Sequence, residues 1–519
     1  MGGRRDMKFT DRFSDFRRKH SLTLSAVSEM TGIDVKTLLR YESGQENPDP
    51  ETEKRIFDGA KCDCACNSAP KPDYSMQFVW ESYASELNVE YRQSVEEGKD
   101  IQKYEDLFSA AAKMEACEEK DRIADVLFDI VTQAPVREGY QYDEPDDLPS
   151  IRALLRCPEN TAKKDAPSGE ALYDKIYGAW LGRIAGCLLG KPVEGIRTNE
   201  LHPLLKESGN FPMHRYILST DVTDERAEAT KYPLKGRCYA DTVEAMPVDD
   251  DTNYVVLAQL LVDRYGREFS SDDVMRVWIE YQGKNAYCTA ERVAYVNFVK
   301  GFRPPFSARY KNPYREWIGA QIRGDYFGYI NPGNPAKAAE MAWRDASISH
   351  VKNGIYGEMF ASAMIAEAAV ETDIEKILTA GLNEIPKTSR LYEAITEIIT
   401  DYRKGMSREA AFAGIHARWN EHNAHDWCHT ISNAEIVAAA LLYGEGDFGA
   451  SICMAVETGF DTDCNGATVG SILGMRNGAR SIDDKWTKPF NNLLDTSIFG
   501  VGRVNLSEMA EKTITHMEK

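Results

Sequence analysis

Two acidic clusters in this chain carry residue types that could do chemistry. One is Asp461-Thr462-Asp463, and the other, earlier in the chain, is Asp249-Asp250-Asp251-Thr252. Either cluster alone fits the start of a helix, because Asp and Thr cap free backbone N–H groups. Together they offer carboxylate oxygens, which suit hard cations such as Mg2+ or Mn2+ and do not suit Zn2+. The five aspartates, Asp249, Asp250, Asp251, Asp461 and Asp463, are therefore candidate ligands of two divalent ions that could activate a water.

Two glycine-striped helices would position these acids. Glycines recur at every fourth residue and so share a helix face, at Gly178, Gly182, Gly186 and Gly190 and again at Gly466, Gly470, Gly474 and Gly478. Each Gly costs roughly 1 kcal/mol against Ala inside a helix, a cost that close approach of two backbones would offset. We therefore expect helices 178–190 and 466–478 to pack tightly. If they run antiparallel, Glu194 after the first lies near Asp461 and Asp463 at the start of the second.

Apolar residues at helical spacing dominate the rest of the chain, for example over 74–135, 336–346, 353–370, 388–403 and 433–442. Strand-like alternation is scarce, so the sequence predicts an all-α fold. The helix after Asp251 is apolar nearly all round, which indicates that it is buried. We expect three domains: an N-terminal unit at 8–60, a helical packing or linker domain at 74–155, and the domain with the acidic clusters at 170–515.

Composition excludes some classes of function. The net charge is −20 and the pI is about 5.1, which argues against a protein that binds nucleic acid or anionic membrane over its whole surface. Residues 1–40 differ, with nine Lys and Arg against five Asp and Glu. Because Met1–Phe16 has no apolar signal segment and no apolar run reaches transmembrane length, we expect a cytoplasmic protein with no membrane partner.

Two further stretches allow more than one interpretation. Residues 300–335 are rich in Pro, Gly and aromatics, so Arg323 and nearby Gly amides could hold phosphates, and an ordinary surface loop fits about as well. His425 and His429 are spaced for one helix face and suggest a zinc site with His422. Because no further ligand is clear, we favour a packed loop before helix 433–442.

The N-terminal unit resembles the helix-turn-helix family of the phage-repressor type. The resemblance rests on Leu22, Val27, Gly32-Ile33, Leu38, Tyr41-Glu42, Gly44 and Pro48. In that family the second helix enters the major groove of duplex DNA, which implies outward-facing contacts from Val35, Lys36, Thr37 and Arg40. Leu24 stands where the family often has a Gln near a phosphate, so residues 11–60 could instead be a protein-interaction module.

Residues 170–500 resemble the ADP-ribosylglycohydrolase family, which includes the enzymes that remove ADP-ribose from modified dinitrogenase reductase. The motifs are Gly186-Cys-Leu-Leu-Gly190-x-Pro192-x-Glu194, Asp250-Asp251-Thr252 and Gly459-x-Asp461-Thr-Asp463. The resemblance implies an all-α globule with a binuclear Mg2+ site and Glu194 beside the scissile glycosidic bond. It implies metal ligands at Asp250, Asp251, Asp461 and Asp463, and substrate contacts from Arg323, Asp325, His350 and Gly459.

The chain departs from the family at three positions. Asp249 replaces a frequent Thr ligand, which adds negative charge, and Cys187 replaces a frequent Asp in the glycine helix. Cys464 replaces a frequent Thr that touches the second metal, and a thiol is a poor partner for Mg2+. As a candidate ligand, Cys464 implies a more weakly held ion, the softer Mn2+, or a thiol that stays outside the coordination sphere.

The resemblance implies a metal-dependent hydrolase that cleaves a glycosidic bond of ADP-ribose on a protein side chain or a small conjugate. The alternative, from another class, is a transcriptional regulator that senses ADP-ribose or a related nucleotide with weak or no turnover. Release of ADP-ribose in the presence of Mg2+ or Mn2+ would distinguish the two.

Overall fold

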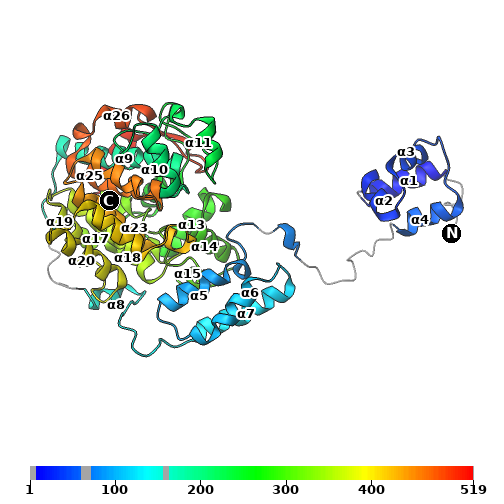
Figure 1. Cartoon of the computed structure of the whole chain (residues 1–519), viewed down its shortest axis with the longest axis horizontal. Coiled ribbons are helices and arrows are strands. Elements are labelled where there is room, and N and C mark those ends of the chain that lie inside the picture. Colours follow the sequence, from blue (N-terminus) through cyan, green and yellow to red (C-terminus); the bar gives the residue numbers. More distant parts are fainter. Residues whose placement is uncertain (1–7, 21, 60–71, 77, 156–162, 518–519) are drawn as a thin grey trace. The chain divides into compact units, whose positions relative to one another are not determined.

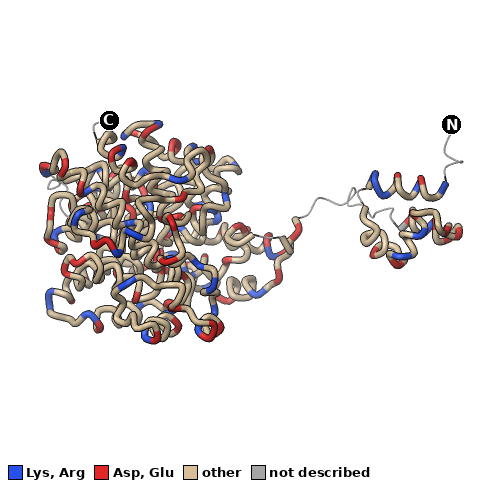
Figure 2. The backbone as a smooth tube through the Cα atoms, turned by 90° about the horizontal axis from the view of Figure 1, so that it is seen from above, with Lys and Arg blue, Asp and Glu red and all other residues tan. Residues whose placement is uncertain are grey.

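The computed structural model describes residues 8–20, 22–59, 72–76, 78–155 and 163–517. The chain forms two compact units, Met1–Met76 and Gln77–Lys519. Acidic and basic residues are interspersed along both units (Figure 2). In the part of the chain that the structure describes, every helix is too short or too polar to cross a membrane.

Four helices form the first unit around a small apolar core with Phe13, Val27 and Leu38 at its centre. They are α1 (Phe9–Lys19), α2 (Leu24–Thr31), α3 (Val35–Glu42) and α4 (Pro50–Gly59). Gly32 ends α2 in a left-handed conformation, and the Asp34 side chain caps α3 by accepting from the N–H groups of Lys36 and Thr37. Val35, Lys36 and Arg40 are exposed on α3 and Thr37 is half-buried. Their contact with DNA remains a prediction.

The second unit is helical throughout apart from one short hairpin, so the predicted all-α fold is confirmed (Figure 1). Its first helices are α5 (Leu87–Glu96), α6 (Glu105–Ala112), α7 (Glu118–Gln133) and α8 (Leu148–Ala153). The remaining elements are α9 (Gly169–Gly190), α10 (Thr198–Glu207), α11 (Asp224–Ala229), α12 (Asp250–Tyr265), α13 (Ser271–Tyr281), α14 (Thr289–Val299), α15 (Phe306–Arg309), α16 (Asp325–Tyr329), α17 (Pro335–Ala346), α18 (Lys352–Ala368), α19 (Ile374–Asn383), α20 (Arg390–Arg403), α21 (Arg408–Arg418), α22 (Ala424–Cys428), α23 (Thr430–Tyr443), α24 (Phe448–Glu457), α25 (Thr462–Asn477), α26 (Asp484–Thr487), β1 (Leu493–Asp495), β2 (Arg503–Asn505) and α27 (Leu506–Thr515). β1 and β2 pair antiparallel, with Leu494 opposite Val504.

The central contact joins α9 and α25, which lie side by side (Figure 1). A Cβ atom on Gly178 would lie 2.4 Å from the carbonyl oxygen of Gly474, and one on Gly182 would lie 2.1 Å from that of Gly470. A Cβ on Gly186 would lie 1.9 Å from the Gly466 oxygen. The partners run in opposite chain order, so the helices are antiparallel and only glycine fits between them. The predicted packing of the two glycine helices is confirmed.

Residues 78–155 belong to the same compact unit as the helices after α9, whereas the sequence suggested a separate domain. The reason is a set of buried ion pairs across the contact. Arg315 donates from Nη1 to Glu90 and from Nε to Glu97, at 3.0 and 2.5 Å. Arg390 donates from Nη2 to Glu144 at 2.8 Å. Removing one partner of such a buried pair costs about 3–5 kcal/mol, so these contacts hold the segment in place.

We expect Gly186→Ala to lower the free energy of unfolding by about 3 kcal/mol or more, because its Cβ would lie inside the contact distance of the Gly466 oxygen. Chemical denaturation monitored by circular dichroism measures this. The control is Gly414→Ala in α21, whose Cβ would meet only the Arg418 side chain at 3.6 Å; this change should stabilise by up to about 1 kcal/mol. Equal denaturation midpoints for Gly186→Ala and the wild type would contradict the packing described.

Candidate metal centre

The ends of three helices bring the acidic clusters together. Asp461 is the N-cap of α25 and Asp463 lies in its first turn, while Glu194 follows the short turn Lys191–Val193 at the end of α9. One ligand atom from each of Glu194, Asp461 and Asp463 lies within 4.8 Å of the others. The predicted approach of Glu194 to the start of α25 is therefore confirmed. The hydroxyl of Thr462 donates to the Gly190 carbonyl at 3.0 Å and fixes the two helix ends to each other.

The first turn of α12 lies against the same point. Asp251, Asp463 and Cys464 form a second group with ligand atoms within 4.8 Å, and Cys187, Asp249 and Asp251 form a third. Asp249 caps α12 through the Asp251 N–H, at 2.9 Å. Asp250 is half-buried and Glu194 is exposed, whereas the other four aspartates are buried. The cluster therefore opens to solvent on the side of Glu194 and Asp250.

The carboxylate oxygens in this cluster outnumber the hydrogen-bond donors around them. Asp251 Oδ2 and Asp463 Oδ1 are buried and have no hydrogen-bond partner among the residues that the structure describes. Burial and the negative charge of Asp249 raise the pKa of Asp250 to about 8 and that of Asp463 to about 6. The negative charge of Asp463, with those of Asp249 and Asp250, raises the pKa of Glu194 well above its usual range. Oxygen atoms that are buried, crowded and unpaired are typical of a site for a hard cation.

Two basic residues that the sequence analysis missed offset part of this charge. Arg183 in α9 is fully buried, donates from Nη1 to Asp325 Oδ2 at 2.7 Å and from Nη2 to Asp251 Oδ1 at 3.0 Å. The ammonium of Lys191 lies 2.5 Å from Asp249 Oδ2. The sequence did contain a signal for Arg183: it is a charged residue in an otherwise apolar, glycine-striped helix. A charge buried in this way needs a partner of opposite charge.

The two thiols at the site are Cys187 and Cys464. Burial raises the pKa of both well above the usual value, and nearby carboxylates (Asp249 for Cys187, Asp251 for Cys464) raise them further. Both are therefore protonated at neutral pH, and a neutral thiol binds a hard cation weakly. Cys464 lies within reach of Asp251 and Asp463, and its role as a ligand remains a prediction.

Arg323, Asp325 and His350 do not lie on a surface loop, as the sequence allowed; residues 312–333 are buried. Arg323 donates to Glu291 at 2.9 Å and to the Ser349 hydroxyl at 2.8 Å, and it also pairs with Asp345. These contacts favour a structural role for Arg323 and, through Arg183, for Asp325. His350 Nε2 has no hydrogen-bond partner in the described part of the chain and lies 4.0 Å from Glu291 Oε1. Substrate contact by these three residues remains a prediction.

Gly459 lies in the tight turn that places Asp461 at the start of α25. Its φ is +77° and that of Phe460 is +59°, so two successive residues are left-handed. A Cβ on Gly459 would lie 2.7 Å from Glu421 Oε2, which adds a steric reason for glycine. The Asn433 side chain, another residue that the sequence did not single out, accepts from the Asp461 N–H at 3.3 Å. Gly459 thus positions Asp461, and its contact with substrate remains a prediction.

The histidine pair lies apart from the acidic cluster, against Glu96 of α5. His425 Nε2 is 2.9 Å from Glu96 Oε2, and His429 Nε2 is 3.7 Å from the same atom. Each Nδ1 accepts a hydrogen bond, from the Trp317 indole N–H and the Ile431 backbone N–H, both at 3.1 Å. Because each Nδ1 accepts, the ring proton lies on Nε2, facing Glu96, which disfavours a metal even though the three side chains lie within ligand distance of one another. The contacts therefore favour a structural role over a zinc site. His425 lies in α22 and His429 caps α23, so the segment is helical and not the loop that the sequence predicted.

The comparison with protein families agrees with the earlier resemblance. The family described as ADP-ribosylglycohydrolase matches residues 168–518. Among solved structures, an "ADP-ribosylglycohydrolase-related protein complex" is 16% identical and covers 67% of this chain and 99% of its own, with a TM-score of 0.43. No curated protein matches the sequence. Since the family match spans more than half of the 519 residues, the chain belongs to the ADP-ribosylglycohydrolase family.

Proposed function

We propose that this chain hydrolyses a glycosidic bond between ADP-ribose and a protein side chain or small acceptor, with divalent cations bound at the acidic cluster. Membership of the family supports a glycohydrolase that acts on ADP-ribose. The observation that carries the proposal is the convergence of Glu194, Asp461 and Asp463 with the start of α12, with carboxylate oxygens left unpaired.

The residues present fit a pair of Mg2+ or Mn2+ ions. Asp251 and Asp461 each offer a ligand atom within 4.8 Å of one of Asp463, and Asp249 offers one within the same distance of Asp251. Asp250, between Asp249 and Asp251 in the chain, is a further carboxylate that we assign to the ions. The unpartnered oxygens of Asp251 and Asp463 are what such ions would satisfy. When bound, divalent ions would orient ribose hydroxyls and lower the pKa of a water.

Glu194 is the candidate catalytic residue, because it is the exposed carboxylate of the cluster. In the proposed step the water oxygen bonds to the anomeric carbon while the bond to the acceptor breaks, through an oxocarbenium-like state. Glu194 takes one proton from the water and returns it to the leaving group. Its raised pKa, caused first by the Asp463 charge, suits a group that both accepts and donates a proton. For the alternative, a nucleotide-sensing regulator with little turnover, the described residues offer no supporting feature beyond the exposed side chains of α3.

Asp461→Asn should lower the rate of ADP-ribose release by at least about 100-fold, because it removes a carboxylate from the metal cluster. Liquid chromatography of released ADP-ribose from an ADP-ribosylated substrate, with Mg2+ or Mn2+ present, measures the rate. The exposed Asp484 at the start of α26 gives a matched control, Asp484→Asn, which should keep the wild-type rate. Turnover retained by a folded Asp461→Asn protein would refute the assignment.

For Glu194→Gln we expect ligand binding without turnover, since the amide keeps the shape and cannot take a proton. The rate should fall by roughly 10²–10⁴-fold, while calorimetric affinity for ADP-ribose changes little. If kcat stayed near the wild-type value, Glu194 would be a surface acid at a helix end rather than a proton carrier.

Stability should depend on pH and on divalent ions together. The pKa of Asp250, about 8, and that of Asp463, about 6, exceed the ordinary 3.8. In chelated protein the folded state therefore holds more protons than the unfolded chain between pH of about 4 and 8, and the free energy of unfolding falls as pH rises through that window. Mg2+ should raise Tm more at pH 8 than at pH 6, because at pH 6 it must displace protons. Equal increases at both pH values would count against a carboxylate metal site.

A further inference from the structure

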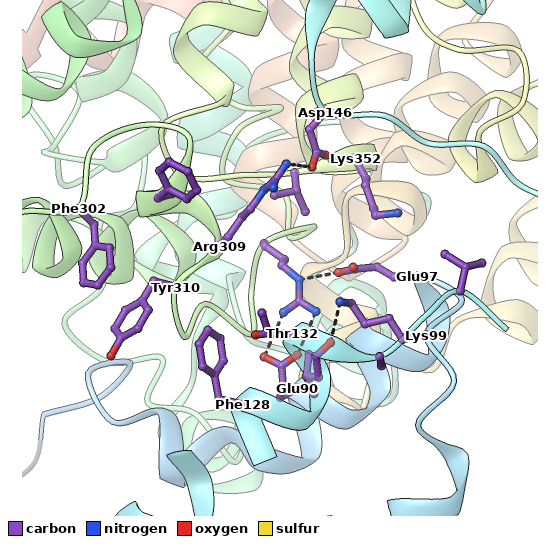
Figure 3. A pocket seen from close by; sticks show the side chains of 16 residues that line it. Glu90, Glu97, Lys99, Phe128, Thr132, Asp146, Phe302, Arg309, Tyr310 and Lys352 are labelled. Carbon is purple, nitrogen blue, oxygen red and sulfur yellow. Dashed lines mark hydrogen bonds and ion pairs between the residues drawn. The ribbon is translucent and has the colours of Figure 1, made fainter. Parts of the chain in front are cut away.

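A cavity lies away from the acidic cluster, between residues 90–136 and residues 302–352 (Figure 3). Its volume is about 520 Å³, within the range of about 300–1,000 Å³ that is common for small-molecule sites. It lies where the segment that precedes the family-matched region packs on the hydrolase helices α15 and α18.

One side of the cavity is aromatic. The rings of Phe302 and Tyr310 are stacked, with centroids 4.2 Å apart and planes at 18°. Phe128 of α7 meets Tyr310 edge-on, at 5.4 Å and 75°. Figure 3 shows these three rings together on the side opposite Lys99 and Lys352. An aromatic wall of this kind suits a flat ring, which gains contact area and stacking from it.

The opposite side is cationic. Arg315 is neutralised by Glu90 and Glu97, and Arg309 pairs with Asp146 at 2.5 Å. The remaining two cations, Lys99 and Lys352, have no carboxylate within ion-pair distance among the described residues; Lys99 Nζ instead donates to the Val131 carbonyl at 2.9 Å. The cavity thus has four basic side chains against three acidic ones, in a chain whose net charge is −20.

Lys352 is held in an unusual conformation. Its φ is +46°, in the left-handed region that a lysine rarely adopts. The backbone N–H of Lys352 donates to Asp146 Oδ1 at 2.7 Å, which fixes the residue at the start of α18. In Figure 3 its side chain lies along the cavity wall, on the same side as Lys99. Left-handed non-glycine residues that the surroundings enforce cluster at ligand sites.

Lys352 also disfavours the charged form of Lys99. Burial lowers the pKa of Lys99, the nearby Glu97 raises it, and Arg315 and Lys352 lower it further. A bound anion would relieve this repulsion, and it would give the ammonium of Lys352 an acceptor that the described side chains do not offer.

We infer that this cavity binds a planar aromatic anion of about mononucleotide size, with its ring against Phe128 and Tyr310 and its anionic group on Lys99 and Lys352. The site is separate from the acidic cluster, and the inference does not depend on the proposed hydrolysis. Because the ligand would touch both the segment 90–136 and the hydrolase helices, its binding should strengthen their contact and raise Tm.

Isothermal titration calorimetry of the full chain tests this with AMP as the planar anion and adenosine as its uncharged counterpart. We expect AMP to bind more tightly than adenosine, and Lys352→Met to weaken AMP binding by at least about tenfold, as loss of a charged hydrogen bond implies. Lys352→Arg should restore most of the affinity. Lys404→Met, at an exposed lysine of another helix end, should leave it unchanged.

Asp461→Asn separates this site from the acidic cluster, since it should leave AMP affinity unchanged even where hydrolysis is lost. Thermal unfolding of Lys352→Met confirms that the variant folds. Absence of AMP binding would overturn the inference. So would wild-type affinity in a folded Lys352→Met protein, or equal affinity for AMP and adenosine.

Discussion

The backbone-to-backbone contact of α9 and α25 is the constraint on which the rest of the structure depends. Four-residue spacing of glycine puts bare backbone on one face of each helix, and the antiparallel fit leaves no room for a methyl group at Gly182 or Gly186. This contact sets the axial register of the helices to within a fraction of a turn. As a result, the last turn of α9 and the first turn of α25 end at the same level. Glu194 and Asp461 then meet without any contact of their own to bring them together.

The meeting of the helix ends concentrates negative charge, which basic side chains partly offset. Five aspartates and one glutamate gather where three helices end, and dense packing holds them there although they repel. Arg183 in α9 and Lys191 in the turn directly after it reduce the repulsion. The helix and this turn therefore provide the steric contact, the counter-charges and the proposed catalytic carboxylate. The close packing of α9 against α25 along their length keeps the acids near one another even without a cation.

The helix pair and the meeting of the acidic residues could be predicted from the sequence, because both depend on local sequence patterns. The glycine period predicted the helix pair, and the order of the acidic motifs predicted the meeting of Glu194 with Asp461. The features that could not be predicted depend on contacts between residues that are far apart in the chain. Residues around Arg323 have the composition of a loop, yet they are buried, and Glu291 and Asp345 from distant parts of the chain pair with the Arg323 guanidinium there. In the same way, nothing near His425 in the chain indicates that Glu96 reaches it.

The buried pairs of Arg315 with Glu90 and Glu97 have a practical consequence. The family-matched region begins at residue 168, so a fragment cut there would lack both glutamates and keep the guanidinium without its counter-ions. An uncompensated charge in the interior is among the most damaging defects that a fold can carry. The boundary of family resemblance is therefore not the boundary of autonomous folding in this chain. A shortened hydrolase meant for crystallisation should begin before α5 rather than at α9.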